Sequence, residues 1–203
     1  MSWKHRTARR AALVSLACGV VALGFASYDI MGARAYQSAE RERFERARQH
    51  PAAAFAAITP RAVAAPVPTD GVSIGEIQIP RLGLRAMVSQ GESASVLRRS
   101  VGHLSDTALP GEVGNVVLAG HRDTFFRPLS GVRAGDSIAL KTWSGEFEYV
   151  VESTSVVAPG AIEVLEPRGG RTLTLITVDP FSYVGAAPNR FIVRARQRIE
   201  VPE

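Results

Sequence analysis

The chain has 203 residues, of which 46% are hydrophobic, and its formal net charge is +5. This length predicts one folded domain with appended segments. The basic residues are spread along the chain, so membrane topology and solvated surfaces explain the charge better than nucleic-acid binding does. The single cysteine, Cys18, excludes an intrachain disulfide and a cysteine-based zinc site.

The N-terminal segment predicts a membrane anchor. Residues 1–10 form a basic tail, and residues 11–28 carry no charge. As a helix this stretch spans about 27 Å, close to the thickness of the hydrocarbon layer. The preceding basic residues place the N-terminus in the cytoplasm and the rest of the chain outside. A cleaved signal peptide and lipidation at Cys18 are the alternatives, and we favour an uncleaved single-pass anchor.

Two connecting segments follow the predicted anchor. Residues 29–50 are rich in Ala, Glu, Arg and Gln, which predicts a solvated helical stalk. Tyr36 and Phe44 are too sparse to form a coiled-coil seam. Residues 51–71 are rich in Ala and Pro and lack periodicity, so we expect a linker that lifts the folded domain off the membrane.

Residues 72–203 predict an all-β domain, either a closed barrel or a sandwich, because short β-rich runs alternate with turn signals. A short helix is expected over residues 94–101, with Val96, Leu97 and Val101 on its buried face. Strands are expected over 76–80, 82–88, 115–121, 137–140 and 172–178 and from Arg190 onward, with a hairpin over 142–157 that turns at Ser144-Gly145.

The sequence contains neither a glycine-rich phosphate loop nor a His/Asp/Glu cluster with the spacing of metal ligands. His103 and His121 are too isolated to indicate a zinc pair. We therefore predict no cofactor and no metal.

The candidate functional residues lie where predicted strands end. His121 follows an apolar strand and opens the polar sequence Arg-Asp-Thr, and Arg190 opens the last strand after Pro188-Asn189. Taken alone, each is equally compatible with a polar residue at the boundary of a strand.

The motifs in combination resemble those of the sortases, membrane-anchored cysteine transpeptidases, and most closely those of class D. Leu118-Ala-Gly-His121 matches the family's histidine motif, and Leu173-Thr-Leu-Ile-Thr177 matches its nucleophile strand up to the last residue. Arg190 follows Val178 by 12 residues, the family's spacing between nucleophile and arginine. The resemblance extends over roughly residues 72–198.

The resemblance implies a closed β-barrel of about eight strands and cleavage and transfer of a sorting signal related to Leu-Pro-x-Thr-Gly. The implied partners are that peptide, on a secreted or surface protein, and an amine acceptor. His121 would serve as general acid and base, and Arg190 would stabilise the oxyanion. The implied location is the cytoplasmic membrane, with the barrel outside in the cell envelope.

One position departs from the family pattern, since Val178 occupies the place of the nucleophilic cysteine. Valine has no lone pair and cannot form a thioester, so we expect the covalent route to be closed. The chain is then either a sortase whose catalysis depends on another residue or a non-catalytic, sortase-like peptide-binding or scaffold protein. Whether it is an enzyme therefore stays open at this point, and loss of activity is the favoured interpretation.

Four other residues are candidates to replace the missing thiol. Thr177 is adjacent, but its side chain should point to the opposite face of the strand. Asp179 could pair with His121 or Arg190, or could simply end the strand before Pro180. Ser182 lies in the following loop, and Cys18 is separated from the domain by stalk and linker.

Overall fold

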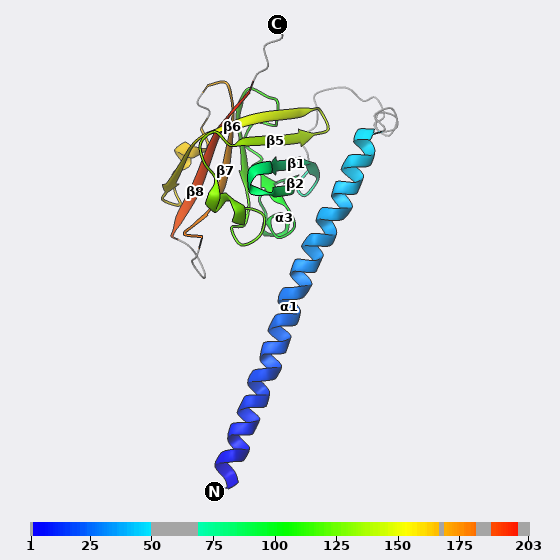
Figure 1. Cartoon of the computed structure of the whole chain (residues 1–203), viewed down its shortest axis with the longest axis vertical. Coiled ribbons are helices and arrows are strands. Elements are labelled where there is room, and N and C mark those ends of the chain that lie inside the picture. The colour runs from blue at the N-terminus through cyan, green and yellow to red at the C-terminus, as the bar shows by residue number, and fades with distance from the viewer. Residues whose placement is uncertain (1, 50–68, 167–168, 182–187, 199–203) are drawn as a thin grey trace.

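The structure is a computed structural model that describes residues 2–49, 69–166, 169–181 and 188–198. One long helix precedes a closed barrel with the strand order β1-β2-β3-β4-β7-β8-β6-β5 (Figure 1). This confirms the predicted all-β barrel over the alternative of a sandwich. The elements are α1 (Ser2–Gln49), β1 (Ser73–Ile79), η1 (Pro80–Leu82), β2 (Leu84–Gln90), α3 (Ala94–Leu97), β3 (Val101–His103), β4 (Gly114–Ala119), η2 (Arg127–Gly131), β5 (Ser137–Thr142), β6 (Glu146–Val157), η3 (Ile162–Val164), β7 (Arg171–Asp179) and β8 (Asn189–Gln197).

The core follows from alternation along the strands. Leu173 and Leu175 on β7 are fully buried in the central apolar cluster, which also includes Leu118 of β4 and Val193 of β8. Because neighbouring side chains on a strand point to opposite faces, Thr177 shares the inner face with Leu173 and Leu175. Position 178 then belongs to the outer face of the barrel.

The expected helix over 94–101 is too long. The helix α3 ends at Leu97, and Val101 already begins β3, which pairs in parallel with the end of β2. A Cβ atom on Gly102 would lie 2.4 Å from the backbone oxygen of Gly91, so this crossing of two backbones requires glycine. The three residues of β3 are too few to produce a visible alternation in the sequence.

The expected hairpin is present with its turn in place and its second arm ends at Val157 as expected, but its first arm is longer than expected because β5 runs unbroken from Ser137 to Thr142. β5 and β6 pair in antiparallel fashion from Ser137↔Val150 to Lys141↔Glu146, so the turn contains the predicted Ser144-Gly145. Tyr149 and Val151, which lie on the same face of β6, are buried.

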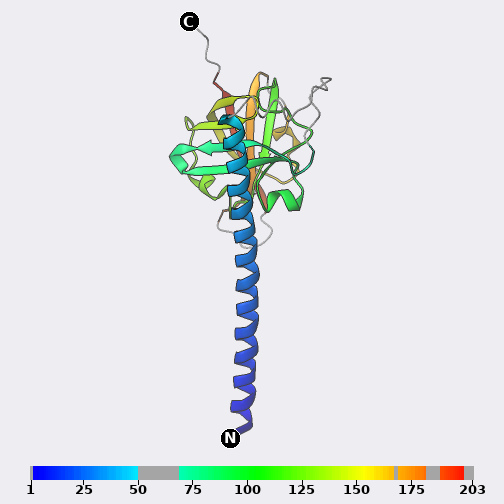
Figure 2. The same ribbon diagram turned by 90° about the vertical axis from the view of Figure 1, so that its right-hand side faces the viewer.

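The predicted anchor and stalk form one continuous helix, α1, whose C-terminal half lies beside the barrel while its N-terminal half extends away from it (Figures 1 and 2). Within the described residues, we find no helix with both the length and the apolar character needed to cross a membrane. Leu16, Val20 and Leu23 of the N-terminal half are between 61% and 70% exposed. Residues 51–68 of the predicted linker lie outside the described residues.

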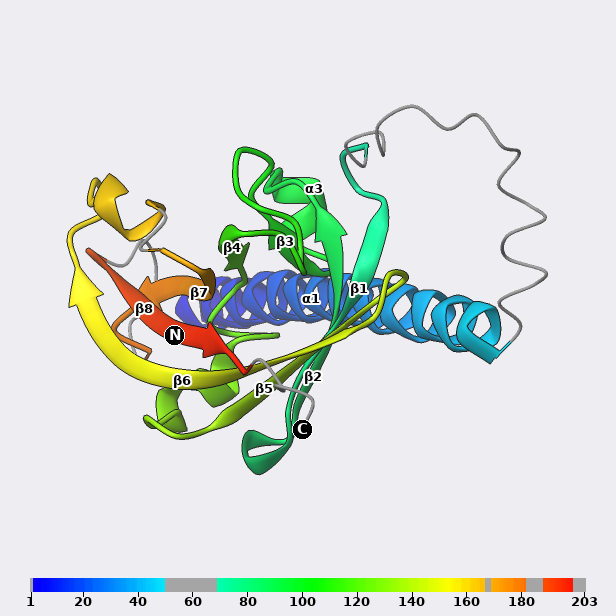
Figure 3. The ribbon, with the colours of Figure 1, turned by 90° about the horizontal axis from the view of Figure 1, so that it is seen from above.

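The prediction of a solvated stalk is wrong for one face of α1, which packs on β1 and β2 (Figure 3). The ring of Phe44 is fully buried and meets Trp143 edge-on, with the ring centroids 4.7 Å apart. The Gln37 side chain accepts a hydrogen bond from the Met87 backbone N–H at 2.8 Å and donates one to the Arg99 carbonyl at 2.7 Å. The helix is therefore part of the folded unit.

Candidate functional site

The three residues of the predicted site are brought together by strand register. β4 and β7 are parallel neighbours with Ala119 opposite Ile176, so His121, two residues after β4 ends, and Val178, near the end of β7, lie at the same end of these two strands. On the other side of β7, Val178 pairs directly with Arg190 of β8. The structure thus places position 178 between the histidine and the arginine, at one end of three adjacent strands.

The ends of β4 and β7 are joined beyond the regular ladder. The Gly120 N–H donates to the Ile176 carbonyl at 3.1 Å, and the Gly120 carbonyl accepts from the Thr177 hydroxyl at 2.8 Å. A Cβ atom on Gly120 would come within 2.7 Å of the Phe126 ring. Glycine at this position therefore lets the chain pass close to Phe126 and present His121 immediately after the strand.

The loop that begins at His121 is a compact turn. The His121 carbonyl accepts from the backbone N–H groups of Thr124 at 3.3 Å and Phe126 at 3.0 Å. Phe126 is fully buried and fastens the loop to the core, while the His121 side chain is exposed. A rigid loop with an exposed imidazole at its start suits proton transfer or hydrogen bonding to a bound ligand.

Arg190 lies across the ladder from Val178 and is half-buried. Its Nη1 donates to the backbone carbonyl of Asn189 at 3.2 Å. Among the described residues, no carboxylate forms an ion pair with Arg190, although a guanidinium has five N–H donors. Judged from the described part of the chain, the other donors of Arg190 are available to bind an incoming carbonyl or oxyanion.

Asp179 ends β7 opposite Asn189, which fits its interpretation as a strand-ending residue. The ion pairs of the described residues do not include Asp179 with either His121 or Arg190. Beyond Pro180, the Phe181 ring packs edge-on against Phe191 of β8, with the ring centroids 5.3 Å apart. The segment after the strand is thus held against the barrel by an aromatic contact.

The considered substitutes for a thiol do not take its place in the described part of the chain. Thr177 is 3% exposed, and its hydroxyl is committed to the Gly120 carbonyl. Cys18 is an exposed residue in the N-terminal half of α1, the half that extends away from the barrel (Figure 1). Ser182 lies outside the described residues.

His103 is separate from this site. It is fully buried, its Nδ1 lies 2.9 Å from Gln90 Oε1, and its Nε2 lies 2.9 Å from the Ala108 carbonyl. Burial lowers the pKa of His103 below its ordinary value of 6.5. Within the described residues no group of three or more His, Cys, Asp or Glu could hold a metal ion, and His103 functions as a core residue.

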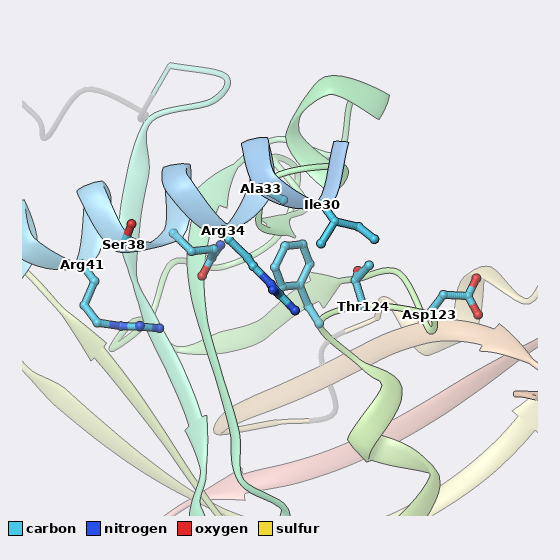
Figure 4. A pocket seen from close by; sticks show the side chains of 9 residues that line it. Ile30, Ala33, Arg34, Ser38, Arg41, Asp123 and Thr124 are labelled. Atoms are coloured by element: carbon cyan, nitrogen blue, oxygen red, sulfur yellow. The ribbon is translucent and has the colours of Figure 1, made fainter. Parts of the chain in front are cut away.

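A cleft of about 500 Å³ separates α1 from the loop that follows His121. Its walls are formed by Ile30, Arg34 and Arg41 of the helix and by Thr124 and Phe125 of the loop, among others. Arg34 extends from the helix toward the loop (Figure 4). No sequence pattern predicts this cleft, because its helical wall exists only when α1 docks on the barrel.

Comparison with known proteins identifies the family. The sequence model of the sortase domain matches residues 77–198. The chain belongs to the sortase family. It is 35% identical over 131 residues to Sortase D of Bacillus subtilis (strain 168), a match that covers 64% of this chain and 66% of that protein. It is 28% identical over 132 residues to Sortase A of Streptococcus agalactiae serotype III (strain NEM316), covering 60% of this chain and 51% of that protein. The match therefore covers slightly under two thirds of the length of Sortase D and about half of the length of Sortase A.

Solved structures support the same assignment. Sortase E of Streptomyces avermitilis superposes with a TM-score of 0.56 at 33% identity, covering 64% of this chain and 91% of that one. A Sortase D5 transpeptidase of Clostridium perfringens gives 0.65 at 24% identity, covering 83% and 99%, and shows that the fold is shared. The class D character read from the motifs agrees with the match to Sortase D.

Sequence reasoning missed one residue of this region, Arg122. It follows His121 in a polar sequence that suggests a solvated loop, yet its side chain is only 4% exposed. Its Nη1 donates to the carbonyl of Pro180, which is distant in sequence, so the local pattern carried no signal of this contact.

Proposed function

We propose that this sortase-family chain binds an extended sorting-signal peptide across the ends of β4, β7 and β8 and does not transfer it. The observation that carries the proposal is the position of Val178 between His121 and Arg190. The peptide-binding neighbours are kept, while the atom that would attack the peptide is absent. Sortase C of Clostridium perfringens, 28% identical with a TM-score of 0.59 and covering 64% of this chain and 73% of that one, has been solved with its C-terminal cell wall sorting motif.

The groups at the strand ends suit a peptide backbone. Arg190 can donate to a carbonyl oxygen, and the exposed His121 ring can donate to or accept from a neighbouring group. The half-buried Val178 offers an apolar surface between them. In a family enzyme a thiolate at this position would attack the scissile carbonyl, and the histidine would protonate the leaving amine. A valine leaves that carbonyl bound and unattacked.

The same region argues against a hidden catalytic substitute. Thr177 points to the inner face, and its hydroxyl already donates to Gly120. To act as a nucleophile it would have to break this bond and turn to the opposite face of the strand. Family chemistry with an amine acceptor accordingly belongs to the cysteine variant, Val178→Cys, rather than to the chain itself.

Membrane attachment is part of the proposal. Residues 11–28 lack charge and follow Lys4, Arg6, Arg9 and Arg10, and large apolar side chains such as Leu16 are exposed along the N-terminal half of α1. These features support a single-pass anchor with the N-terminus in the cytoplasm and the barrel on the other side of the membrane. Carbonate-resistant membrane association and protease access to the barrel from outside the cell are the expected results. Release by carbonate would count against the anchor.

A binding titration tests the peptide proposal. The full-length chain in detergent is titrated with a fluorescent Leu-Pro-x-Thr-Gly peptide, and anisotropy and cleavage are followed together. Saturable binding without cleavage is expected, and a scrambled peptide should not bind. Arg190→Gln should weaken binding because it removes the guanidinium donors. Absence of saturable binding would refute the binding role, and cleavage that disappears in His121→Ala would refute the absence of transfer.

A further inference from the structure

Arg122 is an arginine in an unusual environment. Its side chain is only 4% exposed, and arginine is rarely buried unless its guanidinium is bonded. Its Nη1 donates to the Pro180 carbonyl at 2.8 Å. Its Nε lies 3.4 Å from Oδ1 of Asp123, whose carboxylate is 75% exposed. The guanidinium therefore contacts the chain just beyond β7 from a residue adjacent to His121.

The bond to Pro180 joins two segments of the candidate site that are distant in sequence. Pro180 comes two residues after Val178, and Arg122 comes one residue after His121. The residue that follows Pro180, Phe181, packs on Phe191 of β8. Within the described residues, the segment Asp179–Phe181 is thus held by the pairing of Asp179 with Asn189, by the Phe181–Phe191 contact and by a charged hydrogen bond from the His121 loop.

We propose that Arg122 is a positioning residue that fixes the segment Asp179–Phe181 against the His121 loop. It thereby sets the relative places of His121 and Val178 at the strand ends. The use of these strand ends for peptide binding rests on the function proposed above, whereas the mechanical role of Arg122 does not. A guanidinium suits this role because it carries several fixed donors and stays charged when it is buried.

Hydrogen exchange tests the mechanical role. Exchange of residues 177–181 is compared by mass spectrometry in the full-length chain, in Arg122→Gln and in Arg127→Gln, a matched control on the exposed surface of η2. Loss of a charge-assisted bond should speed exchange there on the order of tenfold in Arg122→Gln. Arg122→Lys, which keeps the positive charge and a hydrogen-bond donor group at this position, should retain part of the protection. Strand β1 should be unchanged in all variants.

Two results of this experiment would overturn the proposal. One is unchanged exchange of residues 177–181 in Arg122→Gln. The other is an equal increase in β1, which would show that Arg122 supports the whole barrel rather than this segment.

Peptide affinity provides the readout that a merely structural residue would not change. Arg122→Gln should weaken binding of the Leu-Pro-x-Thr-Gly peptide on the order of tenfold, because displaced groups bind poorly. Arg127→Gln should not alter binding. Unchanged affinity in a variant with a loosened segment would refute positioning. If the unaltered chain binds no peptide, the proposed function fails, and hydrogen exchange still decides the role of Arg122.

Discussion

Arginine side chains occur in two regions of this molecule, and the regions differ in whether a carboxylate pairs with the arginine. Where α1 docks on the barrel, the fully buried carboxylate of Glu76 accepts from Arg41 and Arg85, each at 2.7 Å, and from Gln78 at 2.8 Å. Burial by itself would raise the pKa of Glu76, but the hydrogen bonds from Arg85, Arg41 and Gln78 outweigh it and hold the pKa below its ordinary value. The charges here are closely paired.

At the end of β4, β7 and β8 the pattern is the opposite. Arg190 donates to a backbone carbonyl, His121 exposes its ring, and Val178 between them is apolar. Paired charges hold elements together, whereas donors with spare capacity on a rigid frame are available to a ligand. Changes at the α1 contact should therefore alter stability, and changes at the strand ends should alter binding or chemistry at nearly constant stability.

The largest effect is expected where chemistry is restored. In a Val178→Cys background, His121→Ala should lower kcat/KM for the sorting peptide by a factor on the order of 10²–10⁴, the usual contribution of a general acid–base residue. The thermal midpoint should not change, because the His121 side chain is exposed. Arg127→Gln in the same background is the control and should turn over normally. An equal kcat/KM with and without the His121 side chain would show that this histidine takes no part in catalysis.

A smaller effect, on stability alone, is expected from Glu76→Gln. It leaves Arg41 and Arg85 facing each other over a neutral amide and should cost about 2 kcal/mol, a value reduced because both arginines are partly exposed. Glu42→Gln is the matched control, since its i,i+4 pair with Arg46 is exposed and should contribute less than about 0.5 kcal/mol. Urea unfolding measures both. A change in peptide affinity without a change in stability would reverse the assigned roles.

The smallest effect is a pH dependence that comes from His103. Its folded-state pKa lies below 6.5, so below about pH 6.5 the unfolded chain binds a proton that the folded chain excludes. The free energy of unfolding should therefore fall as the pH is lowered from about 7.5 to 5.5, by at most about 1.4 kcal/mol per pH unit. Urea titrations at both pH values, repeated on His103→Gln, should show a flatter dependence in the variant. An equal pH dependence in the unaltered chain and in His103→Gln would show that another group causes it.

The barrel could be predicted because its strands alternate and because turn residues mark their ends. The candidate site residues are singled out by the family motifs, and register accounts for their neighbours because they lie at strand ends; their role as a site stays a prediction. The docking of α1 could not be predicted from hydropathy, since its contact face uses Gln37 and Arg41 together with Phe44. Their spacing of three to four residues is helical, but polar residues at that spacing usually indicate a solvated surface. Whether this face of α1 is solvated or packed on the barrel depends on Met87 and Glu76, which are distant in sequence.

The central claim is that this chain keeps the sortase frame without its nucleophile, and intact mass measurement tests it most directly. The full-length chain and its Val178→Cys variant, both carrying Cys18→Ser to remove the other thiol, are incubated with the Leu-Pro-x-Thr-Gly peptide. We predict that the cysteine variant gains the mass of the acyl fragment as a thioester and that the valine chain gains none. An acyl adduct on the valine chain, or a folded and peptide-bound cysteine variant that never forms one, would contradict this account.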